Sequence, residues 1–138
     1  MMKKNLVVVG YGGMGGWHTQ HALKSDVVNL LGIYDIDEKK SALARERGIF
    51  AYNSLEDVLA DKNVDLITVA VPNDSHIGIV VKALEAGKNV ICEKPVAMDS
   101  CELDRMIEAA EKSGVTLICF TRDRRFTVYA HPERISGI

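Results

Sequence analysis

The stretch VVVGYGGMGGWH, residues Val7 to His18, decides the fold that we expect for this chain. An apolar run leads directly into five glycines, which occupy five of the seven positions from 10 to 16. Glycine loses more conformational freedom on ordering than any other residue, so this cluster indicates a geometric demand on the backbone. Gly10, Gly12 and Gly15 fit the spacing G-x-G-x-x-G, which is informative where a strand precedes it and a helix follows.

Continuous apolar runs recur along the rest of the chain. They cover residues 6–9, 28–34, 66–71, 89–92 and 115–120, with a weaker run at 49–52. Runs of this length without polar alternation are typical of strands that are covered on both faces, as in parallel sheets. These runs therefore predict about six strands.

Segments with helical periodicity separate these runs. Apolar residues recur at i, i+3, i+4 and i+7 over residues 77–84 and 103–110, and a glycine follows each segment. Ser54 and Asp99 are each followed three residues later by an acidic residue, a pattern that resembles a capping box at the start of a helix. The periodicity predicts about five helices that alternate with the strands.

This alternation predicts an α/β fold with a doubly wound parallel sheet, the Rossmann arrangement, in the strand order 3-2-1-4-5-6 and in a single domain. We assign residues 1–126 to this dinucleotide-binding domain. Residues 127–138 have no clear periodicity. We expect them to form a tail or the start of a missing C-terminal domain.

The composition excludes several classes of function. The formal net charge is −2 and no basic stripe is present, so we expect no nucleic-acid partner. No apolar stretch reaches the ~18 residues of a membrane span, and the N-terminus lacks the features of a signal peptide. Three widely spaced cysteines predict free thiols, and no spacing of His, Cys, Asp and Glu resembles a metal site. We expect a cytoplasmic protein with no membrane or metal partner.

The residues that follow each apolar run are the candidates for a site, because ligands bind beyond the carboxyl ends of the strands in such sheets. Gly10 would permit a tight turn, Gly12 the approach of a pyrophosphate, and Gly15 the close packing of the helix on the sheet. The helix N-terminus would offer free N–H groups and its positive dipole end to the phosphates. We include the intervening Gly13 and Met14 in this predicted site.

An acidic residue follows the second apolar run. Asp35 lies 25 residues after Gly10, close to the ~20 expected of the acid that binds the adenosine ribose. Its charge would repel a 2′-phosphate, so we predict NAD in preference to NADP. Ile36 is included in the site, whereas Asp37 is interpreted as the N-cap of the next helix. The competing interpretation is a glycine-rich turn that binds nothing.

The run at 66–71 ends in the polar sequence VPNDSH. We predict that this loop contacts the cofactor through Val71, Pro72, Asn73 and His76. The alternative is a capping loop, in which Asn73 or Asp74 caps the following helix and His76 has no functional role.

The run at 89–92 changes abruptly into charged residues at the expected ligand edge. Glu93 and Lys94 follow Cys92 directly. A lysine there could donate or accept a proton during catalysis. The alternative is a solvated loop residue.

Taken in this order and spacing, the segments VVGYGGMGGWH, YDID, VPNDSH, EKP and RRF resemble the Gfo/Idh/MocA oxidoreductase family over residues 5–126. Members of that family combine an N-terminal Rossmann domain with a C-terminal α/β domain that has a large open sheet. They oxidise or reduce hydroxyl groups of sugars, cyclitols or related compounds with NAD or NADP, generally as dimers or tetramers.

The resemblance implies roles for individual residues. Lys94 would be the catalytic lysine, Glu93 would lie against the nicotinamide half of the cofactor, and Pro95 would follow a cis peptide bond. Arg124 and Arg125 would reach the cofactor or the substrate. The VPNDSH loop would lie beside the nicotinamide ribose.

The chain departs from the family because it stops before the Asp and His that complete the family's catalytic site. Two hypotheses therefore stay open. The chain is the NAD-binding domain of a dehydrogenase that acts on a sugar or polyol, or it is a stand-alone, non-catalytic module that binds or senses a dinucleotide. Under the first hypothesis, we expect a homo-oligomer formed through a domain absent here, and no turnover by this chain alone.

Overall fold

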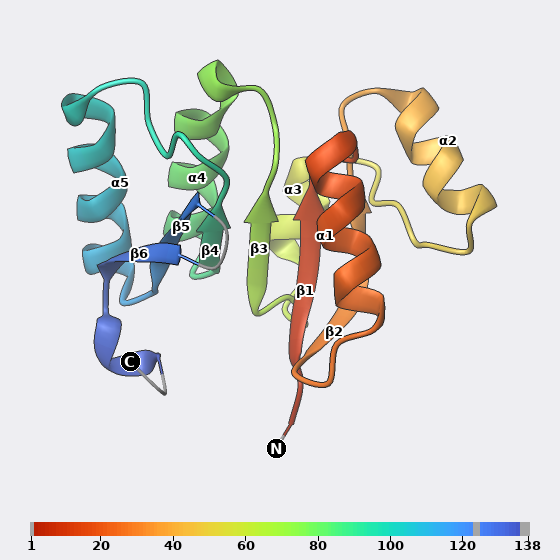
Figure 1. The fold of residues 1–138 in the computed structure, drawn as a ribbon, viewed down its shortest axis with the longest axis horizontal. Helices are drawn as coiled ribbons and strands as arrows, with labels where there is room; N and C mark the ends of the chain where they lie inside the picture. Colours follow the sequence, from red (N-terminus) through yellow and green to blue (C-terminus); the bar gives the residue numbers. More distant parts are fainter. Residues whose placement is uncertain (1, 123–124, 136–138) are drawn as a thin grey trace. The chain divides into compact units, whose positions relative to one another are not determined.

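The computed structural model describes residues 2–122 and 125–135. These residues form two compact units, an N-terminal unit of residues 1–71 and a C-terminal unit of residues 72–138. Each unit is described by itself below (Figure 1). Among the described residues, no helix has both the length and the apolar character needed to cross a membrane.

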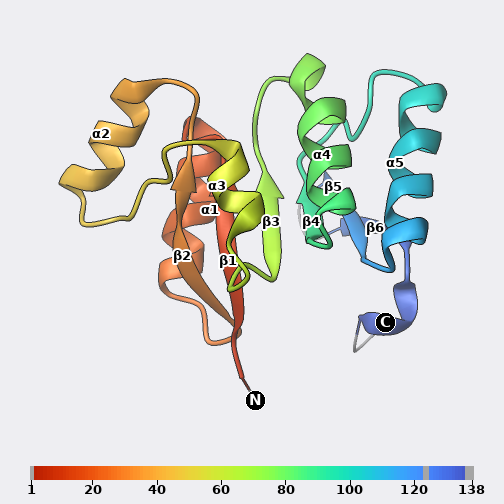
Figure 2. The same ribbon diagram turned by 180° about the vertical axis from the view of Figure 1, so that it is seen from behind.

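The N-terminal unit consists of strands and helices in alternation. Its elements are β1 (Lys4–Val9), α1 (Gly13–Leu23), β2 (Val28–Tyr34), α2 (Glu38–Glu46), α3 (Leu55–Ala60) and β3 (Leu66–Val69). Strand β1 pairs in parallel with both β2 and β3. Helix α1 lies on one face of these strands and α3 on the other, as the two opposite views show (Figures 1 and 2). The unit is therefore wound on both faces, as the sequence predicts.

The register of these strands brings their carboxyl ends to one edge. Val9 pairs with Tyr34 of β2 and with Val69 of β3, so all three strands end at the same level. Val7, Val8 and Val9 are at most 1% exposed, which agrees with a strand covered on both faces. The residues that follow Val9 and Tyr34 thus emerge side by side.

The weak apolar run at 49–52 does not form a strand. A single bridge links Ala51 to Ile33 of β2, with hydrogen bonds from Ile33 N to Phe50 O (2.9 Å) and from Tyr52 N to Ile33 O (2.9 Å). The segment ends there because Ser54 already caps α3, its side chain accepting a hydrogen bond from Asp57 N. Its position beside β2 is nevertheless the one that the order 3-2-1-4 predicts.

The C-terminal unit begins at Pro72, the second residue of the VPNDSH loop. Its elements are η1 (Asn73–Ser75), α4 (His76–Glu85), β4 (Asn89–Cys92), α5 (Ser100–Ser113), β5 (Leu117–Arg122), β6 (Arg125–Ala130) and η2 (Pro132–Arg134). Strands β4 and β5 pair in parallel, as predicted for the last two strands of the order. Helices α4 and α5 pack against each other on one face of these strands (Figure 2).

Strand β6 was not expected from the sequence. It pairs antiparallel with β5, with Leu117 opposite Ala130, so residues 127–130 are not a frayed tail. The boundary that we placed after residue 126 falls inside this strand. The search for continuous apolar runs missed β6, although Phe126, Thr127, Val128 and Tyr129 are all residue types that favour strands.

Candidate functional site

The turn after β1 requires glycine at two positions. Gly10 has a φ of +96°, and a Cβ built on it would collide with the carbonyl oxygen of Ala70. A Cβ on Gly15, in the first turn of α1, would collide with the carbonyl oxygen of Gly10. Helix α1 therefore begins in direct contact with the turn, and these two glycines have the geometric roles that the motif predicts.

Gly12 has the opposite surroundings. It is the N-cap of α1, with φ −89° and ψ −152°, and a Cβ built on it or on Gly13 would meet nothing within 4 Å. Among the described residues, no side chain caps α1 and no acidic residue lies in its first turn. The first N–H groups of the helix thus have no side-chain cap, and there is room beside Gly12 and Gly13 at its positive end, an arrangement that suits a phosphate.

Asp35 lies at the end of β2 and is tied to this turn by its carboxylate. One oxygen, Oδ2, accepts a hydrogen bond from Tyr11 N (2.8 Å), and Oδ1 accepts one from Asp37 N (2.8 Å). The side chain is half-buried, and the neighbouring Ile36 is 92% exposed. Each carboxylate oxygen keeps capacity for a further hydrogen bond, because an ionised carboxylate accepts about four.

Asp37 is the N-cap of α2, as predicted. Its Oδ1 accepts a hydrogen bond from Lys39 N (2.9 Å). Asp35 and Asp37 therefore have different tasks although they are two residues apart. The first fixes the turn after β1, and the second begins a helix.

The contact between Tyr11 and Arg47 was not predicted from the sequence. Tyr11 is 3% exposed, and its hydroxyl accepts a hydrogen bond from Arg47 Nη1 (3.0 Å). The guanidinium carbon lies 5.9 Å from the centre of the Tyr11 ring. Tyr11 thus links the turn to Asp35 by its backbone and to Arg47, just past the end of α2, by its side chain. No spacing rule connects residues 11 and 47, so sequence reasoning could not find this pair.

In the C-terminal unit, the VPNDSH loop is built differently from the sequence expectation. Asn73 does not cap α4 but begins the short helix η1, and Ser75 N donates to Pro72 O (2.9 Å). The N-cap of α4 is Ser75, which makes no side-chain capping hydrogen bond. Pro72 and Asn73 are exposed.

His76 is buried, with 1% of its surface exposed. Its Nδ1 lies 2.9 Å from Pro95 O and 3.3 Å from Cys92 Sγ. We expected this ring to face a cofactor, but within its own unit it lies beneath residues 93–95. Because so little of the ring is exposed, its contacts in this structure are with other residues of the protein.

Lys94 is exposed directly after this buried pair, and the Lys94–Pro95 peptide bond is cis, as the resemblance implied. Glu93 is half-buried. Arg125 is exposed at the start of β6, whereas Arg124 lies outside the described residues.

Burial keeps the thiols near Lys94 neutral. Desolvation raises the pKa of Cys92 far above its usual range, and the neighbouring Cys119 and Glu93 add to this effect. Burial, with a further contribution from Glu93, raises the pKa of Cys119 to about 11. Both thiols therefore hold their protons at neutral pH.

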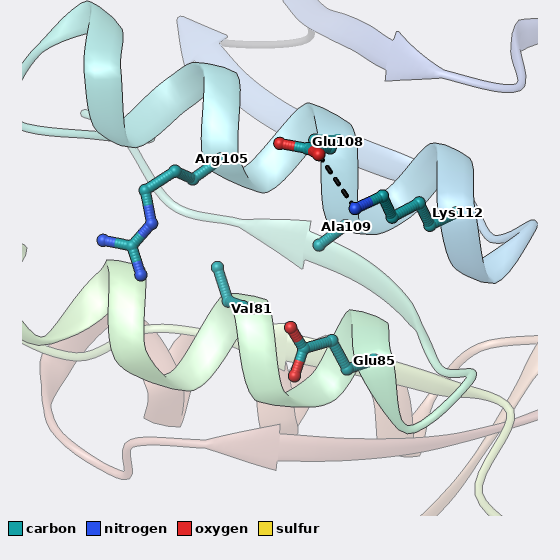
Figure 3. Close-up of a pocket in the computed structure, with 6 residues that line it drawn as sticks. All are labelled: Val81, Glu85, Arg105, Glu108, Ala109 and Lys112. Carbon is teal, nitrogen blue, oxygen red and sulfur yellow. Dashed lines mark ion pairs between the residues drawn. The ribbon is translucent and has the colours of Figure 1, made fainter.

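A pocket of about 180 Å³ lies between α4 and α5 (Figure 3). It is lined by Val81, Glu85, Arg105, Glu108, Ala109 and Lys112. Glu108 pairs with Lys112 at 2.9 Å on the surface of α5. The pocket contains none of the predicted site residues. Within the described ranges, no three His, Cys, Asp or Glu side chains come together as metal ligands would.

Comparisons with known proteins agree with these features. Residues 4–121 match the Gfo/Idh/MocA family model, described as an oxidoreductase family with an NAD-binding Rossmann fold. The chain is 33% identical over 124 residues to myo-inositol 2-dehydrogenase of Thermotoga maritima, covering 86% of this chain and 37% of that protein. It spans about a third of the length of the curated relatives that it matches.

Two solved structures resemble the chain closely. One is an NAD-binding protein from Listeria innocua, with 42% identity, a TM-score of 0.82, and coverage of 86% of this chain and 35% of that one. The other is the WlbA dehydrogenase of Bordetella pertussis in complex with NADH and UDP-GlcNAcA, with 28% identity, a TM-score of 0.82, and coverage of 90% and 38%. The chain therefore belongs to the Gfo/Idh/MocA oxidoreductase family and carries its NAD-binding Rossmann fold.

Proposed function

We propose that this chain binds NAD through residues 10–16, which we call the glycine loop, and through Asp35. The observation that carries the proposal is the contrast among the glycines. Gly10 and Gly15 are packed so tightly that a Cβ would collide with backbone, whereas Gly12 faces open space above an uncapped helix. A turn that served the fold alone would need the first two glycines but not the third.

The pyrophosphate would lie over Gly12 and Gly13. The N–H groups of the first turn of α1 would donate to its oxygens, and the helix dipole would favour its negative charge. The residues present fit this group, because no side chain described in the structure competes for these N–H groups.

Asp35 would hold the adenosine ribose. Two backbone N–H groups already fix its carboxylate, so the oxygens are oriented before any ligand arrives. Their remaining capacity suits two neighbouring ribose hydroxyls. A 2′-phosphate would bring a second negative charge to this place, so NAD would bind more tightly than NADP.

Lys94 would act on the substrate as the catalytic lysine of the complete protein. NAD supplies the hydride acceptor in an oxidation of this class. The exposed amine of Lys94 could orient the substrate hydroxyl and take part in moving its proton. The family resemblance alone supports a role for four further residues, which are Glu93, Pro72, Asn73 and Arg124.

The relatives named above favour a dehydrogenase over a non-catalytic sensor. Because Thermotoga maritima myo-inositol 2-dehydrogenase and the WlbA dehydrogenase are among them, we propose a cyclitol, sugar or sugar derivative as the substrate of the complete protein. We further propose a cytoplasmic location, which the three free cysteines suit. Homo-oligomers would form through parts outside this chain, and no nucleic-acid partner is proposed.

Replacing Gly12 with valine tests the proposal. The new side chain would fill the space assigned to the pyrophosphate, so NADH affinity should fall at least about 100-fold (~2.7 kcal/mol). The protein should stay folded, with a small loss of stability because valine is a poorer N-cap residue than glycine. Calorimetric titration measures the affinity. Gly78→Val is the matched control, because a Cβ at Gly78 of α4 also meets nothing within 4 Å. Normal NADH binding by a folded Gly12→Val variant would contradict the proposed site.

A further inference from the structure

The backbone on both sides of Lys94 is held by buried side chains. Cys92 Sγ lies 3.4 Å from Glu93 O, as the donor, and His76 Nδ1 lies 2.9 Å from Pro95 O. The two side chains also meet, with 3.3 Å between Sγ and Nδ1. The carbonyl groups of Glu93 and Pro95, the residues on either side of Lys94, are thus both engaged by this pair.

These contacts fix the protonation of the two groups. A carbonyl oxygen can only accept a hydrogen bond, so His76 must carry a hydrogen on Nδ1 to bind Pro95 O. Burial keeps the Cys92 thiol protonated, so it can donate to Glu93 O. The sulfur, a weak acceptor, can share the Nδ1 hydrogen.

Both side chains come from ordered elements. Cys92 is the last residue of β4 and His76 the first of α4, and they are 0% and 1% exposed. Lys94 itself is exposed. A buried polar group that loses its partner costs the full desolvation of that group, so these hydrogen bonds are strongly favoured over any rearrangement of residues 93–95.

We propose that His76 and Cys92 are positioning residues, which fix the backbone of residues 93–95 and thereby direct Lys94. The inference rests on the proposed function for the role of Lys94 itself. A lysine side chain has four rotatable carbon–carbon bonds, so a mobile backbone would spread its amine over a large volume. Reactions between bound groups need a geometry held within about 0.5 Å, which side chains locked by buried contacts provide.

The first test requires no variant. Nitrogen-15 NMR of the His76 ring in the intact chain should report a hydrogen on Nδ1. A ring with hydrogen on Nε2 alone would overturn the proposal, because that tautomer cannot donate to Pro95 O.

The second test compares two substitutions at one position. His76→Asn keeps an N–H donor close to the place of Nδ1, whereas His76→Gln moves the donor toward Nε2. The backbone order parameter of the Lys94 amide should be about 0.85 in the unchanged chain and in His76→Asn, and should fall below about 0.6 in His76→Gln. An unchanged value in a folded His76→Gln variant would overturn the proposal.

Two controls separate positioning from a general loss of structure. His21→Gln changes an exposed histidine whose Nδ1 contacts the carbonyl of Trp17 in its own helix, so Lys94 should keep its order. Cys92→Ser retains a donor to Glu93 O, so the order parameter of its Lys94 amide should equal that of the unchanged chain. In Cys92→Ala, which lacks the donor, this order parameter should fall. If His76→Gln fails to fold, the proposal is tested by comparing Cys92→Ser with Cys92→Ala and by the NMR measurement of the His76 tautomer.

Neither measurement includes a cofactor. If the proposed function fails, the chain will not bind NADH, although His76 carries its hydrogen on Nδ1 and the Lys94 amide is ordered. Failure of the present inference would show as a mobile Lys94 or the other tautomer, with NADH still bound.

Discussion

The glycine loop and residues 93–95, the two parts of the proposed site, are shaped by opposite means. In the N-terminal unit, the loop is shaped by the absence of side chains, because backbone of Ala70 and Gly10 fills the space that a Cβ would need. In the C-terminal unit, the segment around Lys94 is shaped by two buried side chains from distant positions in the sequence. The spacing of glycines along the sequence predicts a site that is made of backbone. No local motif predicts a site that is held by contacts between distant side chains.

The largest expected effect is on Gly15. Gly15→Ala places a methyl group against the carbonyl oxygen of Gly10, which is backbone and cannot move aside cheaply. We expect a loss of about 3 kcal/mol in the free energy of unfolding, at the upper end for overpacked positions. Denaturant unfolding measures it.

Gly16→Ala is the matched control for this substitution. Gly16 lies in the same helix turn, and its Cβ would meet nothing within 4 Å. Alanine should therefore stabilise the protein by about 0.5–1 kcal/mol through helix propensity. Equal effects of the two substitutions would contradict the tight contact between α1 and the turn.

A smaller effect is expected at Asp35. Asp35→Ser removes the carboxylate that we assign to the ribose and two hydrogen bonds that it accepts from backbone. NAD affinity should fall about 10-fold (~1.4 kcal/mol), and the gap between NAD and NADP should narrow. Calorimetric titration with both cofactors measures the two affinities.

Asp37→Asn changes the same charge two residues away and keeps a good N-cap residue. Its affinities for NAD and NADP should be unchanged. If Asp37→Asn narrows the gap as much as Asp35→Ser does, a general charge effect explains the preference and the assignment of Asp35 is wrong.

The smallest effect tests whether side chains also support the glycine loop. Tyr11→Phe removes the acceptor of the Arg47 hydrogen bond while the backbone bond to Asp35 remains. A single hydrogen bond contributes about 0.5–1.5 kcal/mol to stability, so the free energy of unfolding should fall by about that amount, which denaturant unfolding measures. Arg47→Met should have the same effect, and the double variant should add nothing further. Fully additive losses would show that the two residues do not act as a pair.

The sequence predicted what local patterns encode. Gly10 and Gly15 have the predicted contacts, Asp37 and Ser54 cap helices, and Asp99 does so by accepting a hydrogen bond from Glu102 N (2.8 Å). These features depend on neighbours within a few residues or on a fixed motif, so spacing suffices to find them.

Features that depend on tertiary contact escaped prediction. The protein contacts of His76 were not predicted: its ring is buried against Cys92 and Pro95, 16 and 19 residues away. Strand β6 pairs antiparallel with β5, with Arg122 opposite Arg125, and its burial pattern has no period of two. The partners of His76 lie outside any window that sequence periodicity can use, whereas β6 follows its partner strand directly along the chain.

The most direct test of the central claim is an NMR titration of the ¹⁵N-labelled chain with NAD. If the dinucleotide binds the backbone cradle, the amide signals of Gly12, Gly13 and Met14 should shift most, together with those of Asp35 and Ile36. Largest shifts among the residues that line the pocket between α4 and α5, or no shifts at all, would contradict the account.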